Sequence, residues 1–260
     1  MQTLKAKIES TGHVVGSFVN TASPVCAEIM ARAGFDFLAV DAEHSPVDVP
    51  QAFSLFQAIS AGNPQCAPLV RLPHTGWAEI KRYMDAGAAG VIAPLVKTRT
   101  QAEEVVDAVK YPPQGKRGVG YSRSNGYGAE LTEHVQADND ATFVCLQVEH
   151  VDAVSNLSDI LSVPGVDAVL VGPYDLSASM GLTAQFEHTD VVEAIKHVHH
   201  TCRAKGIVSG LHVVQPDPKV LAARVRDGYG FLSFGLDITF LTHACRQGLA
   251  DIQSELASDE

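Results

Sequence analysis

The sequence lacks a long apolar segment. No stretch stays apolar for the ~18 residues that a membrane-spanning helix needs. Residues 1–9 also lack the apolar core that is typical of a signal peptide. These absences predict a protein with no membrane partner that stays in the cytoplasm.

Basic residues are scarce. Lysine and arginine together number 19 against 30 acidic residues, which gives a formal net charge of −11 with histidine neutral. A surface this acidic repels polyanions, so a nucleic-acid partner is not expected. A small anionic substrate would need local cations or a metal ion to offset the field.

Paired cysteines are also absent. The chain has five cysteines, an odd number, and no two of them form a C-x-x-C pair. This spacing argues against a zinc ribbon and against a disulfide framework. It predicts free thiols in a reducing cytoplasm. The five residues are Cys26, Cys66, Cys145, Cys202 and Cys245.

What the chain does contain is a regular alternation of short apolar runs with stretches of helical periodicity. Its 260 residues are 46% hydrophobic, which is enough for a sizeable core. Four times a helical stretch ends in glycine before an apolar strand, which is typical of a left-handed helix cap. Eight strand–helix units predict an α/β fold, a (β/α)8 TIM barrel, as a single domain over residues 1–260. The four glycines are Gly34, Gly87, Gly165 and Gly228.

The pattern also predicts where the elements begin and end. The predicted strands are residues 14–20, 35–41, 67–72, 90–96, 143–148, 166–171, 207–213 and 231–234. The predicted helices are residues 24–33, 49–60, 77–86, 100–110, 156–161, 191–205, 218–226 and 239–257. An irregular, glycine-rich insertion at 111–140 is expected to form a lid or an interface loop.

Polar side chains follow several predicted strands, at the barrel end where such folds place their chemistry. Glu149 and Asp175 end neighbouring strands, so their carboxylates are expected to converge. Two convergent carboxylates repel unless a proton or cation lies between them, and this pair suits Mg²⁺ or Mn²⁺. Gln147 has the same parity as Glu149 and should point inward. The alternative is that these carboxylates cap the loops after the strands.

Asp41 and His44 follow the second predicted strand. When a carboxylate accepts a hydrogen bond from an imidazole, the imidazole becomes a better general base, so this pair is a candidate for proton transfer. The alternative, which fits the pattern equally well, is a helix-capping aspartate beside a surface histidine. Arg71 ends the third strand, where its guanidinium suits a substrate carboxylate or a developing enolate. Its alternative is a salt bridge to Glu149 or Asp175.

Three further patterns carry weaker signals. Lys97 follows the fourth strand and is a candidate Schiff-base nucleophile. Glu193, His197 and His200 share a helix face, but H-E-x-x-H is absent, so a solvated face is expected. Residues 115–120 lack the Walker pattern and are interpreted as a loop whose cations face a substrate or another subunit.

Five segments together resemble the class II (metal-dependent) pyruvate aldolases of the HpcH/HpaI family, which include hydroxy-oxo-heptanedioate aldolase. They occur in the family's order and span nearly the whole chain. The segments are FLAVDAEHSP (37–46), LVRLP (69–73), YPPQGKRGVG (111–120), QVE (147–149) and VGPYDLS (171–177).

The resemblance implies a role for each candidate. Glu149 and Asp175 would bind a divalent cation (Mg²⁺, Mn²⁺ or Co²⁺), with Gln147 beside it. His44, paired with Asp41, would move protons through water, and Arg71 would steady the pyruvate enolate. The backbone of one segment would hold the substrate carboxylate: Gly172, Pro173, Tyr174 and Asp175.

The reaction that follows from the resemblance is the reversible cleavage of a 4-hydroxy-2-oxo acid to pyruvate or hydroxypyruvate and an aldehyde, through a metal-stabilised enolate. Three alternatives remain: a metal-dependent acyl-CoA lyase of the malyl or citryl type, a Schiff-base aldolase using Lys97, and a non-catalytic barrel. The family is commonly hexameric, a trimer of dimers, so the helix at 239–257 is expected to pack on or exchange with a neighbouring subunit.

Overall fold

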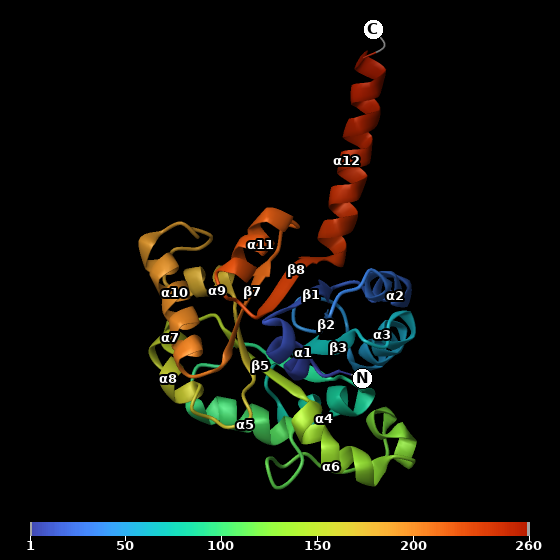
Figure 1. The fold of residues 1–260 in the computed structure, drawn as a ribbon, viewed down its shortest axis with the longest axis vertical. Coiled ribbons are helices and arrows are strands. Elements are labelled where there is room, and N and C mark those ends of the chain that lie inside the picture. Colours follow the sequence, from blue (N-terminus) through green and yellow to red (C-terminus); the bar gives the residue numbers. More distant parts are fainter. Residues whose placement is uncertain (1, 259–260) are drawn as a thin grey trace.

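The computed structural model describes residues 2–258, and its centre is a closed barrel of eight parallel strands in chain order (Figure 1). This confirms the predicted (β/α)8 fold. The strands are β1 (Val14–Val19), β2 (Phe37–Asp41), β3 (Ala67–Arg71), β4 (Gly90–Ala93), β5 (Phe143–Val148), β6 (Ala168–Val171), β7 (Val208–Val213) and β8 (Phe231–Leu236).

Helices surround the strands, and no helix in residues 2–258 is both long and apolar enough to cross a membrane. The first six are α1 (Leu4–Thr11), α2 (Pro24–Arg32), α3 (Val49–Gly62), α4 (Trp77–Ala86), α5 (Arg99–Val109) and α6 (Leu131–Ala141). The others are α7 (Val151–Ser155), α8 (Leu157–Ile160), α9 (Pro173–Ser179), α10 (Thr189–Ala204), α11 (Pro218–Arg226) and α12 (Asp237–Ser258), with a 3₁₀ segment at Arg123–Gly128.

Local sequence signals explain where these elements start and stop. Thr98 caps α5 in a reciprocal capping box with Gln101. All four predicted turn glycines have a left-handed backbone, which a side chain would strain. The strands are buried on both faces because helices cover the outside and side chains fill the inside. Inside the barrel, the rings of Phe37 and Phe231 stack 4.4 Å apart.

The insertion at 111–140 is not the lid that was one of its two predicted roles. It contains α6 and the 3₁₀ segment, and it joins the end of α5 to the start of β5. It therefore lies at the N-terminal ends of the strands, opposite the barrel mouth, and cannot be a lid. Arg117 is buried there, bonds Asp85 (2.8 Å) and Asp138 (3.2 Å), and stacks on Tyr111, so this cation does not face a substrate.

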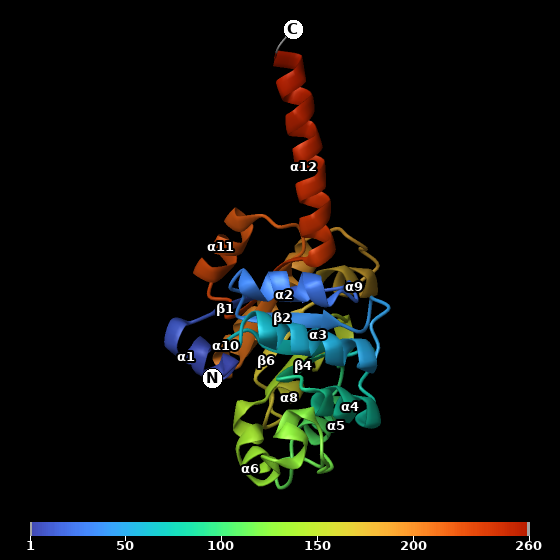
Figure 2. The same cartoon turned by 90° about the vertical axis from the view of Figure 1, so that its right-hand side faces the viewer.

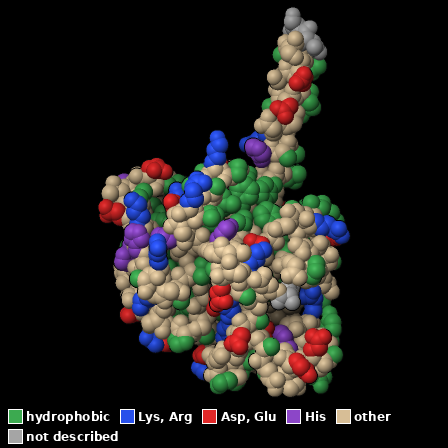
Figure 3. All heavy atoms as spheres, viewed as in Figure 1, with side chains coloured by type: hydrophobic (Ala, Val, Ile, Leu, Met, Phe, Trp, Pro, Cys, Tyr) green, Lys and Arg blue, Asp and Glu red, His purple; other side chains and the backbone are tan. Residues whose placement is uncertain are grey.

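The closing helix α12 projects away from the barrel in both views (Figures 1 and 2), with α6 at the opposite end of the molecule. Its first residue holds it to the loop after β1: the Asp237 carboxylate accepts hydrogen bonds from the Asn20 and Thr21 backbone N–H groups (3.0 and 2.8 Å). Beyond this base, residues 241–258 are exposed. The space-filling view shows apolar side chains along the helix and around its foot (Figure 3).

Candidate active site

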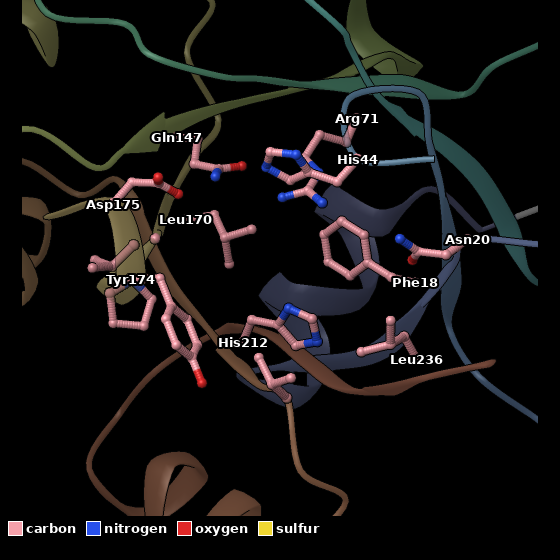
Figure 4. A pocket seen from close by; sticks show the side chains of 14 residues that line it. Phe18, Asn20, His44, Arg71, Gln147, Leu170, Tyr174, Asp175, His212 and Leu236 are labelled. Atoms are coloured by element: carbon pink, nitrogen blue, oxygen red, sulfur yellow. The ribbon is translucent and has the colours of Figure 1, made fainter. Parts of the chain in front are cut away.

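A cavity of about 280 Å³ opens at the C-terminal ends of the strands (Figure 4). Most of the predicted site residues line it, whereas Asp41 and Glu149 are buried beside it. Phe18 and Asn20 also line the cavity and were not among the predicted site residues; an asparagine directly after the first strand was the available signal. The lining includes Phe18, Asn20, His44, Arg71, Gln147, Gly172, Pro173, Tyr174, Asp175 and His212.

The Asp41–Arg71 pair is the best-defined polar contact of the site. The two residues are partners in the register of β2 and β3, so both leave the barrel at the same level. Arg71 donates from Nε to Asp41 Oδ1 (2.8 Å) and from Nη2 to Oδ2 (2.6 Å). Burial opposes ionisation of Asp41, but the hydrogen bonds and charge of Arg71 outweigh it and hold the pKa below its ordinary value. Asn20 adds a third donor, from Nδ2 to Oδ2 (2.7 Å).

The predicted side-chain pairing of Asp41 with His44 is wrong. Asp41 Oδ1 accepts from the backbone N–H groups of Glu43 (3.1 Å) and His44 (3.3 Å), and Arg71 occupies both oxygens. The imidazole of His44 instead lies near Glu43, with Nε2 3.7 Å from Glu43 Oε2. Arg71 in turn bridges to Asp41 and Glu43, not to Glu149 or Asp175.

Glu149 is the buried carboxylate on the opposite wall. Its Oε1 accepts from the Leu95 backbone N–H (2.7 Å), and Gln147 donates to its Oε2. One carboxylate oxygen thus caps the loop after β4, which agrees with the alternative that these carboxylates cap loops. The Glu149 carboxylate nevertheless remains beside the cavity. Burial raises the pKa of Glu149 to about 7, and the charges of Glu43 and Asp175 add to the effect.

Gly172 leaves space for this carboxylate. A Cβ at this position would lie 2.7 Å from Glu149 Oε2 and 3.1 Å from Gln147 Nε2. Any side chain here would press on both polar groups, so the end of β6 can pass over them only as glycine. Pro173 follows and has no backbone N–H, so it cannot take part in the predicted amide binding of a carboxylate.

The donor set fits a hard divalent cation in an open site. Burial raises the pKa values of the Glu43 and Glu149 carboxyl groups, and the negative charge of Asp175 adds to both shifts. Glu43 Oε2 and Gln147 Oε1 are buried and have no hydrogen-bond partner among residues 2–258. Residues 2–258 hold no preformed cluster of three or more metal-ligating side chains. Mg²⁺ commonly takes one or two carboxylates and completes its shell with water and substrate, which matches this arrangement.

The weaker candidates fall outside the cavity. Lys97 lies before α5, where its backbone N–H donates to Gln101 Oε1 (2.8 Å), and it does not line the cavity. Glu193, His197 and His200 form no metal cluster within the described residues. The solvated helix face therefore remains the interpretation of that pattern.

The structure and the comparisons together define the class: this is a barrel enzyme, a carbon–carbon lyase. The family model "HpcH/HpaI aldolase/citrate lyase" matches residues 15–244. The chain therefore belongs to the HpcH/HpaI aldolase/citrate lyase family, and it is an aldolase by that membership.

Individual relatives agree over nearly the whole chain. The chain is 37% identical over 234 residues to a hydroxypyruvate/pyruvate aldolase of Deinococcus radiodurans, covering 89% of this chain and 83% of that one. It is 35% identical to a 2-keto-3-deoxy-L-rhamnonate aldolase of Klebsiella pneumoniae, covering 95% and 91%. An HpcH/HpaI family crystal structure from Burkholderia cenocepacia superposes with a TM-score of 0.92 at 30% identity, covering 97% and 100%.

Proposed function

We propose that this aldolase uses a divalent cation to cleave 4-hydroxy-2-oxo acids reversibly to pyruvate or hydroxypyruvate and an aldehyde. One observation carries the proposal: an oriented guanidinium, Arg71, faces a group of oxygen donors, Gln147, Glu149 and Asp175, at one cavity. The relatives named hydroxypyruvate/pyruvate aldolase support this substrate class.

Arg71 is the group that meets negative charge on the substrate. Asp41 occupies its Nε and Nη2, which fixes the plane of the guanidinium and leaves Nη1 without a protein acceptor within residues 2–258. The pKa of Arg71 is raised because the hydrogen bonds and charge of Asp41 outweigh burial, so the cation persists at every working pH. Nη1 can therefore donate to an oxygen on which enolate charge develops.

Glu149 and Asp175, with Gln147 beside them, would hold the cation. When bound, a divalent cation supplies Lewis acidity toward a 2-oxo acid and balances the carboxylates. The chain's own contribution is to keep Glu149 in place through Leu95 and Gln147, in a setting where burial excludes competing water.

His44 is the residue that we assign to proton transfer. Its imidazole lines the cavity and is exposed to water, which suits a base that acts through a water molecule. The carboxylate closest to the ring is Glu43, so Asp41 is assigned to orienting Arg71 instead.

The test is a metal-dependence and substrate assay on the purified protein. Pyruvate with a panel of aldehydes should give aldol products with Mn²⁺ or Mg²⁺, and a chelator should abolish them. Borohydride with pyruvate should leave every lysine unmodified by mass spectrometry. Full activity in excess chelator, or a pyruvyl–lysine adduct, would refute the proposal.

We also propose that α12 packs against a neighbouring subunit, in a hexamer built as a trimer of dimers. Its exposed apolar residues recur every three or four positions and form one stripe: Ile238, Leu241, Cys245, Leu249, Ile252 and Leu256. On α2, Val25 and Ile29 are exposed as well, at 67% and 62%. Light scattering should give a single oligomer, and truncation before residue 241 should dissociate it. A monomeric wild type would overturn the assignment.

The cytoplasm is the proposed compartment. All five cysteines are free, and three of them are buried in the core, as expected where thiols stay reduced. Thiol titration of protein purified without reductant should count five free groups after unfolding.

A further inference from the structure

Part of the cavity lining is apolar: Phe18, Leu170, Val214 and Leu236. His212 of β7 is the exception, and Figure 4 shows its ring among these side chains, facing the cavity from the side opposite Gln147 and His44. The metal and enolate chemistry described above does not use this ring.

The hydrogen-bonding state of His212 is fixed by its surroundings. Its Nε2 lies 3.0 Å from the backbone oxygen of Gly235, and a carbonyl oxygen only accepts, so Nε2 carries the proton. Burial lowers the pKa of His212 to about 4, so the ring is neutral at pH 7. A neutral ring protonated at Nε2 has an acceptor at Nδ1.

The Nδ1 acceptor has no protein partner within residues 2–258, although Phe18 holds the ring in place by stacking at 4.7 Å and 17°. A hydrogen-bond acceptor of fixed orientation among apolar side chains discriminates strongly between ligands that can donate a hydrogen bond and ligands that cannot. A ligand that cannot donate displaces water from the acceptor and leaves it unpaired. A carbonyl, carboxylate or methyl group cannot donate, whereas a hydroxyl can.

We propose that His212 is a specificity residue that accepts a hydrogen bond from a substrate hydroxyl and so selects hydroxylated substrates. The proposal rests on the proposed aldolase function, since that function places a 2-oxo acid and an aldehyde in this cavity. The hydroxyl has two sources, the C3 hydroxyl of hydroxypyruvate and the 2-hydroxyl of an aldehyde such as glycolaldehyde. The experiment separates them.

The experiment measures two ratios of kcat/KM with Mn²⁺ saturating. One compares hydroxypyruvate with pyruvate at a fixed aldehyde, and the other compares glycolaldehyde with acetaldehyde at fixed pyruvate. We expect wild type to favour the hydroxylated member in at least one arm, and that arm identifies the source. His212→Phe keeps a ring to stack on Phe18 but removes the acceptor, so it should lower that ratio about tenfold.

Two matched variants separate the acceptor from the structural bond. His212→Gln can still donate to Gly235 but loses the acceptor near Nδ1, so it should behave like His212→Phe. His212→Asn can place an amide oxygen near Nδ1 while losing the Gly235 bond, so it should recover part of the preference. If His212 has a purely structural role, His212→Gln should retain more of the substrate preference than His212→Asn, because only glutamine keeps the bond to Gly235.

Two outcomes would overturn the proposal while leaving the aldolase intact: wild-type ratios near one in both arms, or ratios that His212→Phe leaves unchanged. If no substrate pair turns over, the proposed function fails and calorimetry decides the hydroxyl question. Wild type should then bind hydroxypyruvate better than pyruvate, or glycolaldehyde better than acetaldehyde beside pyruvate, and His212→Phe should not. Equal binding by both proteins would refute it.

Discussion

Glu149 connects the chemistry of the site to the stability of the metal-free protein. Burial raises its pKa to about 7, against an ordinary value of 4.5. The folded protein therefore holds this proton more tightly than the unfolded chain does. Stability is gained as the pH falls from about 7 toward 4.5 and is lowest above pH 7. The difference corresponds to ~3 kcal/mol at most, because one pKa unit is about 1.4 kcal/mol.

Glu149→Gln removes the charge and keeps an oxygen for the Leu95 N–H. In a chelator at pH 8.5, we expect its free energy of unfolding to exceed that of wild type by up to ~3 kcal/mol. At pH 5 the gain should largely vanish, because wild-type Glu149 is then protonated. Adding Mn²⁺ at pH 8.5 should stabilise wild type and not the variant. Urea titrations followed by circular dichroism measure all three differences.

Glu104→Gln on the exposed face of α5 is the matched control, since it removes one negative charge without changing burial. Glu104→Gln should change the free energy of unfolding by the same small amount at pH 5 and at pH 8.5. If Glu149→Gln changes stability equally at pH 5 and pH 8.5, the buried carboxylate carries no charge penalty and the reasoning is refuted.

Activity measurements test the other parts of the site. Arg71→Lys should lower kcat/KM and recover only part of what Arg71→Ala loses, because an ammonium cannot bond Asp41 bidentately; equal rates for Lys and Arg would contradict this. His44→Ala should lower kcat by ~10²–10⁴-fold, and an unchanged kcat would assign the base elsewhere. Gly172→Ala should weaken Mn²⁺ binding, measured by titration, since its Cβ would crowd Glu149 Oε2; unchanged affinity would show that the carboxylate can move freely.

The fold could be predicted because its signals are local. Each strand is a short apolar run and four of the return turns carry a glycine, so the order of the eight units can be read along the chain. Element ends were less certain: the fourth strand stops at Ala93 instead of residue 96, and α12 begins at Asp237, before the predicted start at 239. These limits depend on where the barrel closes, which no short window of sequence contains.

The partners of the site side chains could not be predicted in the same way. The sequence predicts that Asp41 bonds the side chain of His44, three residues away, but Asp41 bonds the side chain of Arg71, which is thirty residues away and opposite it in the register. Sequence spacing reveals which residues leave a strand together, whereas the choice of partner depends on the alignment of two strands. Asn20 was missed for the same reason, since its amide meets Asp41 across β1 and β2.

The base of α12 has a consequence for how assembly would affect the chemistry. The Asp237 carboxylate accepts a hydrogen bond from the Asn20 backbone N–H, and the Asn20 side-chain amide donates to Asp41. Asp41 in turn accepts from Arg71 and orients its guanidinium. A tilt of the helix thus moves the loop that aims the guanidinium. If neighbouring subunits set the angle of α12, we expect specific activity to fall on dilution, in step with dissociation and before any loss of the barrel itself.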